Sequence, residues 1–394
     1  MNGEATVRKP RVPKRFYFLN FMVFMPTFIC LIAIQAHWYG YVVTALSFAL
    51  LLWVRHTSAW YGWHVPLCFT LALVVALGAL SLSRPRWDAS LPAQIGSGMV
   101  RIFMRLPVDE NVKYGETFGE ASVWQPDEEH ETSAVQLPNC TLEVLQKKGE
   151  AKGERYAVLQ LHGGAFVAGM NDLYRTIAQK YSVLTNGGTV YTLDYRLYPQ
   201  YPYPSQQNDA MDAWTYLTDV LGYAADRIFV VGDSAGGNLA LNLGLRLRDE
   251  GKDMPAGIVA MSPWADLSNS GESHYKNATL DPTFGVSKDS YDGVSAVGVD
   301  STYAKGLNAQ NPYLSPSFGN YAGFPPMLLQ AGDIEVLLSD SQMVRDNAVQ
   351  NGVDCTLTVY KGVFHVFQGS LDLLPESRKA WEEVGAFLER IMGK

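Results

Sequence analysis

The sequence predicts an α/β fold, with a mostly parallel sheet and helices on both faces, preceded by an all-α transmembrane module of about three helices. After about residue 140, short β-rich runs alternate with helical stretches of roughly 10–15 residues, as in parallel sheets. Before residue 86, three long apolar runs show no such alternation. The mean hydropathy of −0.03 over 394 residues therefore averages two unlike parts.

Charge divides the chain in a similar way. Residues 1–105 carry ten basic and two acidic residues, a net charge of +8, whereas the remainder carries −16. Nucleic-acid binding needs a positive surface that follows the phosphates. The acidic second part has no basic stripe, so the sequence argues against a nucleic-acid partner.

The first part, residues 1–85, is predicted to be a membrane module. Its apolar runs cover about 16–35, 38–54 and 65–82, and each is close to the length that crosses about 30 Å of hydrocarbon. A signal peptide has one short apolar region, so three runs argue against that alternative. Buried core helices remain the other interpretation. We expect a multi-pass membrane protein that contacts the lipid bilayer.

The charges that flank the apolar runs give conflicting indications of orientation. Five basic residues precede Phe16 and favour a cytoplasmic N-terminus, which would place the catalytic domain on the non-cytoplasmic side. Arg84 and Arg86 after the third run favour the opposite arrangement. Two tripeptides, beginning at Asn139 and Asn277, would permit glycosylation in a eukaryotic lumen.

The second part, residues 86–394, begins with a linker rich in Pro, Gly and Arg that extends to about Val108. Strands are then expected at Thr141–Leu145, Tyr156–Leu161, Thr189–Leu193, Ile228–Val231, Gly257–Met261, Met327–Ala331 and Cys355–Tyr360. Helices are expected near Tyr174–Leu184, Ser205–Leu221, Ala235–Asp249, Ser339–Gln350 and Pro375–Ile391. A long polar insert separates the fifth strand from the sixth.

A candidate nucleophile lies between a strand and a helix. Gly232-Asp233-Ser234-Ala235-Gly236 fits the pattern G-x-S-x-G, whose small residues allow the sharp turn that exposes a serine hydroxyl. The helix that follows presents unpaired N–H groups to an anionic intermediate. The alternative is a simple turn that happens to contain a serine.

His162-Gly163-Gly164-Ala165 follows an earlier strand. Its glycines would let the backbone approach a bound carbonyl, so we expect an oxyanion hole from the N–H groups of Gly163, Gly164 and Ala235. A plain glycine turn is the alternative.

A serine needs a base to take its proton, and that base needs an acid to orient it. His365 follows Ser234 in a short loop between a strand and the last helix, and the other six histidines lie in unsuitable places. The acid is expected in the loop after Met327–Ala331, as either Asp333 or Glu335.

Residues from about 110 to 390 resemble the hormone-sensitive-lipase family of α/β-hydrolases, which includes bacterial esterases and the arylacetamide deacetylase type. The matching stretches are His162–Ala165, Asp194–Pro199, Gly232–Gly237, Ser262–Leu267, Asn311–Pro316 and Phe364–Phe367. The resemblance implies the α/β-hydrolase fold, with a cap over the site from about 90–120 and 268–324. The cap insert could be a mobile lid or a plain surface excursion.

The resemblance also assigns roles to residues. Ser234 matches the nucleophile, His365 the base, and Gly163, Gly164 and Ala235 the oxyanion donors. The family's acid lies ten residues after the first Pro of the Pro-Pro that opens its strand, which selects Glu335 over Asp333, although Asp is more usual there. A second departure is Ala165, where the family more often has glycine.

The expected function is that of a membrane-anchored serine hydrolase that cleaves carboxylic esters of short to medium acyl or aryl type through an acyl-enzyme. Its substrate would be a small, lipophilic ester, and it would need no metal or cofactor. Amide or lactone hydrolysis, as in a deacetylase, is the alternative, and a non-catalytic receptor on the same fold is a third. The four cysteines lack metal-ligand spacing and leave open only a Cys140–Cys355 disulfide.

Overall fold

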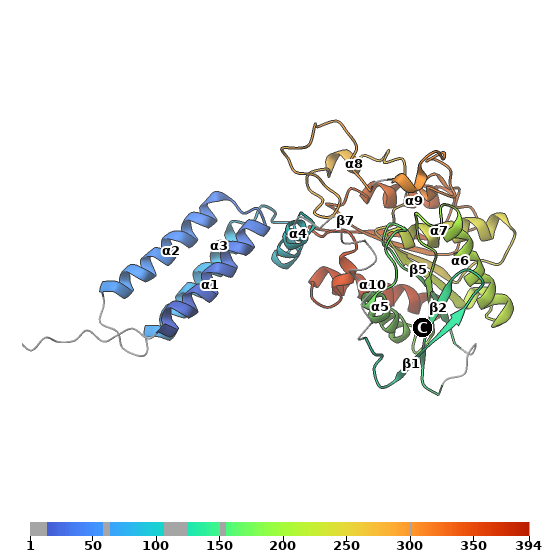
Figure 1. The fold of residues 1–394 in the computed structure, drawn as a ribbon, viewed down its shortest axis with the longest axis horizontal. Helices are drawn as coiled ribbons and strands as arrows, with labels where there is room; N and C mark the ends of the chain where they lie inside the picture. The colour runs from blue at the N-terminus through green and yellow to red at the C-terminus, as the bar shows by residue number, and fades with distance from the viewer. Residues whose placement is uncertain (1–13, 58–63, 106–123, 150–154, 300, 394) are drawn as a thin grey trace, which may run out of the picture. The chain divides into compact units, whose positions relative to one another are not determined.

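The computed structural model describes residues 14–57, 64–105, 124–149, 155–299 and 301–393 (Figure 1). The chain forms two compact units, Met1–Arg105 and Leu106–Lys394, so the boundary falls later than the predicted one at 85/86. The reason is helix α4 (Leu91–Met104), which packs against α1 so closely that a Cβ on Gly98 would clash with the backbone of Ala33. Residues 90–105 of the predicted cap therefore belong to the first unit, and 106–120 lie outside the described residues.

The first unit contains three further helices where apolar runs were expected, namely α1 (Lys14–Ala33), α2 (Trp38–Thr57) and α3 (His64–Leu82). Their common core is small, with Phe24 packed near Ala72 and Ala76. The hydroxyl of Tyr41 donates to the carbonyl of Leu31 and joins α2 to α1. The helical prediction for these runs is confirmed.

The prediction that these helices cross a membrane is not supported. Among the described residues, none of the helices combines the length and the apolar character that a bilayer span requires. Residues 1–13, which carry most of the N-terminal charge used for the orientation, lie outside the described residues. The expected multi-pass location and the side of the catalytic unit therefore stay predictions.

The second unit contains an eight-stranded sheet in the order β1-β2-β4-β3-β5-β6-β7-β8. The strands are β1 (His130–Gln136), β2 (Thr141–Lys147), β3 (Ala157–Leu161), β4 (Thr189–Asp194), β5 (Ile228–Asp233), β6 (Gly257–Met261), β7 (Met327–Gly332) and β8 (Cys355–Tyr360). β2 pairs antiparallel with β1 and β4, and all other neighbours are parallel. Cys140 precedes β2 near one edge and Cys355 opens β8 at the other, and both are free thiols, so the disulfide left open by the sequence does not form.

Helices cover both faces of this sheet (Figure 1). One apolar core joins the sheet to α6 (Ser205–Thr215), α7 (Ala235–Asp249) and α9 (Leu338–Gln350), and a second joins the other face to α5 (Asp172–Leu184) and α10 (Pro375–Ile391). The central strands β3, β5, β6 and β7 are buried along their whole length, which explains their continuous apolar sequences. The predicted α/β fold is confirmed, and its parallel strands point their carboxyl ends to one edge.

The polar insert between β6 and β7 contains little regular structure. It holds the one-turn helix α8 (Ser273–Lys276) and the short helices η3 (Ser301–Ala304) and η4 (Pro316–Phe318). Its inner part includes the fully buried side chains of His274 and Asp281, whereas residues 288–295 are mostly exposed. The insert is therefore more than a plain surface excursion, because part of it is packed into the domain.

Candidate active site

Ser234 occupies the sharp turn between β5 and α7. Its backbone has φ 52° and ψ −119°, a strained conformation for a residue with a side chain. Neither neighbouring glycine can carry a Cβ, because one on Gly232 would clash with the carbonyl of Gly236 and one on Gly236 with the carbonyl of Leu161. The small residues of the pentapeptide are thus required by close backbone packing at this turn.

His365 and Glu335 come together from the loops after β8 and β7. The Nδ1 atom of His365 lies 3.0 Å from Oε2 of Glu335, which is fully buried. Asp333, the alternative acid, lies elsewhere: its Oδ1 accepts the N–H of Gly362 at 2.7 Å and its Oδ2 faces Lys361. Glu335 is therefore the carboxylate that can orient this imidazole.

Ser262 is a site residue that sequence reasoning missed. Its hydroxyl donates to Oε1 of Glu335 at 2.8 Å and accepts the N–H of Val366 at 3.2 Å. One side chain thus ties the acid to the residue that follows His365. The available signal was its place at the end of β6, in the first position of the Ser262–Leu267 motif.

The loop after β3 departs from the predicted oxyanion arrangement. The N–H of Gly163 donates to the hydroxyl of Tyr174 at 2.9 Å and to Oδ1 of Asp233 at 3.2 Å. These acceptors occupy that N–H, which argues against Gly163 as a donor to substrate. Among the described residues, the N–H groups of Gly164, Ala165 and Ala235 have no hydrogen-bond acceptor.

A buried polar cluster fixes the base of this loop. Tyr174 donates from its hydroxyl to Oδ2 of Asp233, and burial raises the pKa of the Asp233 carboxyl to about 6, against the opposing effect of that bond. His162 stacks on Tyr195 with ring centroids 4.1 Å apart, and burial lowers the pKa of this imidazole to about 4. His162 is therefore neutral near pH 7 and serves the packing of the loop.

Strained backbone gathers at this edge of the sheet. Besides Ser234, four non-glycine residues that follow or adjoin the strand ends have positive φ: Ala165 (53°), Phe166 (64°), Ser262 (46°) and Val366 (54°). Each flanks or belongs to a segment that carries a candidate site residue. Such strain persists only where the surrounding structure holds it, and it is concentrated at functional sites.

Two rings of the insert contact the candidate site. Phe284 lies against His365, with ring centroids 4.7 Å apart, and Tyr303 stacks on Phe166 at 4.3 Å. Phe166 directly follows Ala165, so the two contacts reach both His365 and the loop after β3 that carries Gly163 and Gly164. The insert therefore borders the place where a substrate would bind.

Asp266, His274 and Asp340 form a buried cluster whose ligand-type atoms lie within 4.8 Å of one another. Every such atom already has a protein partner: Asp340 accepts the N–H groups of Ala265 and Asp266 and contacts His274 at 2.9 Å, and Asp266 accepts bonds from Ser268 and Ser270. His274 also faces the carbonyl of Val297. These contacts fit an internal ion pair between His274 and Asp340 that ties the insert to α9.

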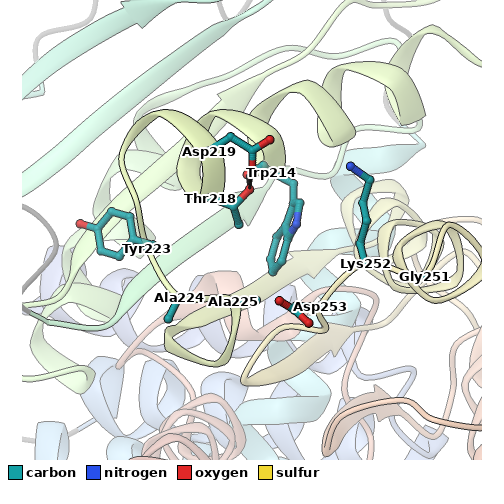
Figure 2. A pocket seen from close by; sticks show the side chains of 9 residues that line it. All are labelled: Trp214, Thr218, Asp219, Tyr223, Ala224, Ala225, Gly251, Lys252 and Asp253. Carbon is teal, nitrogen blue, oxygen red and sulfur yellow. Dashed lines mark hydrogen bonds between the residues drawn. The ribbon is translucent and has the colours of Figure 1, made fainter.

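A separate polar pocket lies beyond the C-terminal end of α7 (Figure 2). Trp214 forms one wall, and the charged side chains of Asp219, Lys252 and Asp253 are exposed around it. Ser234 lies at the opposite end of α7, about 22 Å away for a helix of this length. This pocket takes no part in the candidate site.

The sequence pattern of the α/β hydrolase fold matches residues 158–369, more than half of the chain. An acetyl-hydrolase of Streptomyces hygroscopicus is 32% identical over 260 residues, which cover 66% of this chain and 83% of that protein. A carboxylesterase/phospholipase of Mycobacterium tuberculosis is 32% identical and is covered over 71% of its length, and 68% of this chain is covered. A solved esterase of the bacterial hormone-sensitive lipase family is 32% identical, with a TM-score of 0.63 over 76% of this chain and 98% of its own.

The chain belongs to the hormone-sensitive-lipase family of α/β-hydrolases. The hydrolase is thus an enzyme of the carboxylesterase and lipase type, as the sequence predicted. The resemblance drawn from the motifs is confirmed at the level of family and fold. The matched residues begin well after the first unit, which the family pattern does not include.

Proposed function

We propose that the hydrolase cleaves carboxylic esters of short to medium acyl or aryl type through Ser234, His365 and Glu335. The observation that carries this proposal is the 3.0 Å contact between Nδ1 of His365 and the buried carboxylate of Glu335. A carboxylate in this place fixes the imidazole with its other nitrogen available as a base. The strained turn that presents Ser234 at the same edge of the sheet supports the role of nucleophile.

The reaction would proceed by acyl transfer in two steps. The hydroxyl oxygen of Ser234 attacks the ester carbonyl while His365 takes the hydroxyl proton, and His365 then gives that proton to the leaving alcohol. Water, activated by His365, hydrolyses the acyl-enzyme. The N–H groups of Gly164, Ala165 and Ala235 would hold the oxyanion, and each such donor typically lowers the barrier by about 3 kcal/mol.

The test is turnover of p-nitrophenyl esters of graded acyl length, with anilides and lactones in the same panel. We expect a burst of p-nitrophenol from the butyrate ester that disappears in Ser234→Ala. Wild-type protein that turns over none of these substrates would overturn the proposal. A preference for anilides or lactones over all esters would replace it with the deacetylase alternative.

We also propose that the first unit holds the enzyme against lipid. Its helices expose large apolar side chains, including Trp38 (74%), Leu46 (65%) and Val74 (61%). Extensive exposed apolar surface marks an interaction site, such as one for a membrane. A lipid surface would cover them and bring lipophilic esters near the enzyme. The full chain should float with phosphatidylcholine vesicles, and a Leu46→Lys, Val74→Lys double variant should float less. If neither protein floats with the vesicles, the proposal is wrong.

A further inference from the structure

One segment of the insert, residues 277–284, is hydrogen-bonded to the loop that carries the proposed catalytic acid. The side-chain amide of Asn277 donates to the carbonyl oxygens of Glu335 at 2.7 Å and of Asp333 at 3.1 Å. The two bonds thus hold the backbone of this loop at two positions, Asp333 and Glu335. The insert therefore contacts the acid loop by more than surface packing.

Asp281 makes the second attachment. Its Oδ2 accepts the N–H of Val336, the residue after Glu335, at 2.7 Å. Its Oδ1 accepts the N–H groups of Thr283 at 2.7 Å and Phe284 at 3.1 Å. The side chain is fully buried, and burial raises the pKa of this carboxyl. A buried carboxylate that lost any of these three backbone N–H partners would carry an uncompensated desolvation penalty. Asp281 therefore fixes the three N–H groups relative to one another.

The two ends of this arrangement are the acid and the base. Val336 follows Glu335, and Phe284 packs on the ring of His365 with centroids 4.7 Å apart. The turn between them is tight: the N–H of Val286 donates to the carbonyl of Ala278, and a Cβ on Gly285 would clash with the carbonyl of Asp281. One carboxylate thus connects the backbone beside the acid to the ring that lies against the base.

We propose that Asn277 and Asp281 are positioning residues for the catalytic step, with Asp281 holding the Glu335 loop and Phe284 in register with His365. The proposal rests on the triad proposed above. It makes this segment of the insert a fixed part of the catalytic centre, and not a lid. Neither residue is assigned contact with substrate, so each acts through its hold on the acid loop and on Phe284.

The test compares Asp281→Asn with Asp340→Asn in the full chain. The amide introduced by Asp281→Asn keeps an oxygen for Thr283 and Phe284 but turns its own N–H toward the N–H of Val336, which releases the acid loop. Because small displacements of catalytic groups can lower rates on the order of 10²-fold, we expect kcat to fall about 10- to 100-fold with KM nearly unchanged. Asp340 is equally buried and ties the same insert to α9 through His274 without touching the triad. Asp340→Asn should lower the melting temperature and leave kcat within about threefold of wild type.

Asn277→Ala provides the second variant, because it removes only the two bonds to the acid loop and stays informative if Asp281→Asn does not fold. We expect the same selective loss of kcat. Unchanged kcat in a folded Asp281→Asn or in Asn277→Ala would overturn the positioning role, as would an equal loss in Asp340→Asn. These outcomes assume wild-type turnover that depends on Ser234, and its absence would overturn the proposed function instead.

Discussion

At the residue scale, the proposed acid Glu335 is held through both of its carboxylate oxygens. Its Oε2 contacts His365 while its Oε1 accepts bonds from Ser262 and from the N–H of Gly332. The second oxygen is thus held in place, so the extra methylene does not leave the carboxylate loose. The hydroxyl of Ser262 and the N–H of Gly332, the last residue of β7, both donate to this oxygen.

Replacement of the two candidate acids should therefore have very different effects. Glu335→Gln leaves an uncharged partner for the imidazole, and comparable changes lower kcat by about 10²- to 10⁴-fold. Asp333→Asn keeps an oxygen for the N–H of Gly362 and should change kcat less than about threefold. Steady-state kinetics on p-nitrophenyl butyrate would check both. A larger loss in Asp333→Asn than in Glu335→Gln would contradict the assignment.

His162 should make stability depend on pH. Its imidazole has a pKa of about 4 in the folded chain and 6.5 in the unfolded chain, so the unfolded state binds more protons between these values. This contribution is fully present above pH 6.5 and is lost as pH falls toward 4, by about 3 kcal/mol in the free energy of unfolding.

Urea denaturation of wild type and His162→Phe at pH 7 and pH 4.5 would measure this effect. The variant should lose less stability on acidification, because phenylalanine cannot take up a proton and can still stack on Tyr195. Asp233 contributes with the opposite sign, since its raised pKa favours the folded state as pH falls, but the comparison between the two proteins cancels it. Parallel pH dependence in both proteins would contradict the prediction.

At the scale of elements, the turn between β5 and α7 depends on contact between backbones. A Cβ on Gly236 would meet the carbonyl oxygens of Leu161 and His162 at the end of β3. Gly236→Ala should therefore lower the free energy of unfolding by about 1–3 kcal/mol and move the loop that carries Gly164. Thermal unfolding would show the loss, and a Gly236→Ala variant as stable as wild type would contradict this.

The buried strands were predictable because a strand that is covered on both faces requires a continuous apolar run. All seven predicted strands form, and β3, β5, β6 and β7 among them are buried along their whole length. β1 was missed because it is a polar edge strand with mostly exposed side chains. The role of Gly163 was also out of reach, since its acceptors Tyr174 and Asp233 lie 11 and 70 residues along the chain. Local motifs predicted the turn at Ser234 and the glycine loop after β3, but not the hydrogen bonds that the fold gives to Gly163.

At the scale of the whole molecule, charge and apolar surface are divided between the two units. The first unit carries +8 and exposes many apolar side chains, and the second carries −16. The sequence indicated this division correctly but placed its boundary before α4, because the Pro- and Gly-rich composition after Leu82 suggested a linker. The packing of α4 on α1 depends on small side chains, which carry little signal in a single sequence.

This division predicts a preference for acidic lipid. If the first unit contacts vesicles, its positive charge should increase binding to vesicles with about 30% phosphatidylglycerol over neutral ones. In 1 M salt the Debye length is about 3 Å, so the difference should vanish while apolar binding persists. Co-flotation at low and high salt would measure this. Stronger binding to neutral vesicles at low salt would contradict the prediction.

The bonds of Asn277 also decide which of the two candidate glycan sites a folded molecule could use. Asn277 is 8% exposed and its amide is committed to the acid loop, so a sugar on this nitrogen would exclude the loop from its place. Asn139 lies exposed in the bend between β1 and β2. If the chain enters a glycosylating compartment, a sugar on Asn139 would be compatible with the folded domain. A sugar on Asn277 would mark only those molecules that were modified before this loop had folded into place.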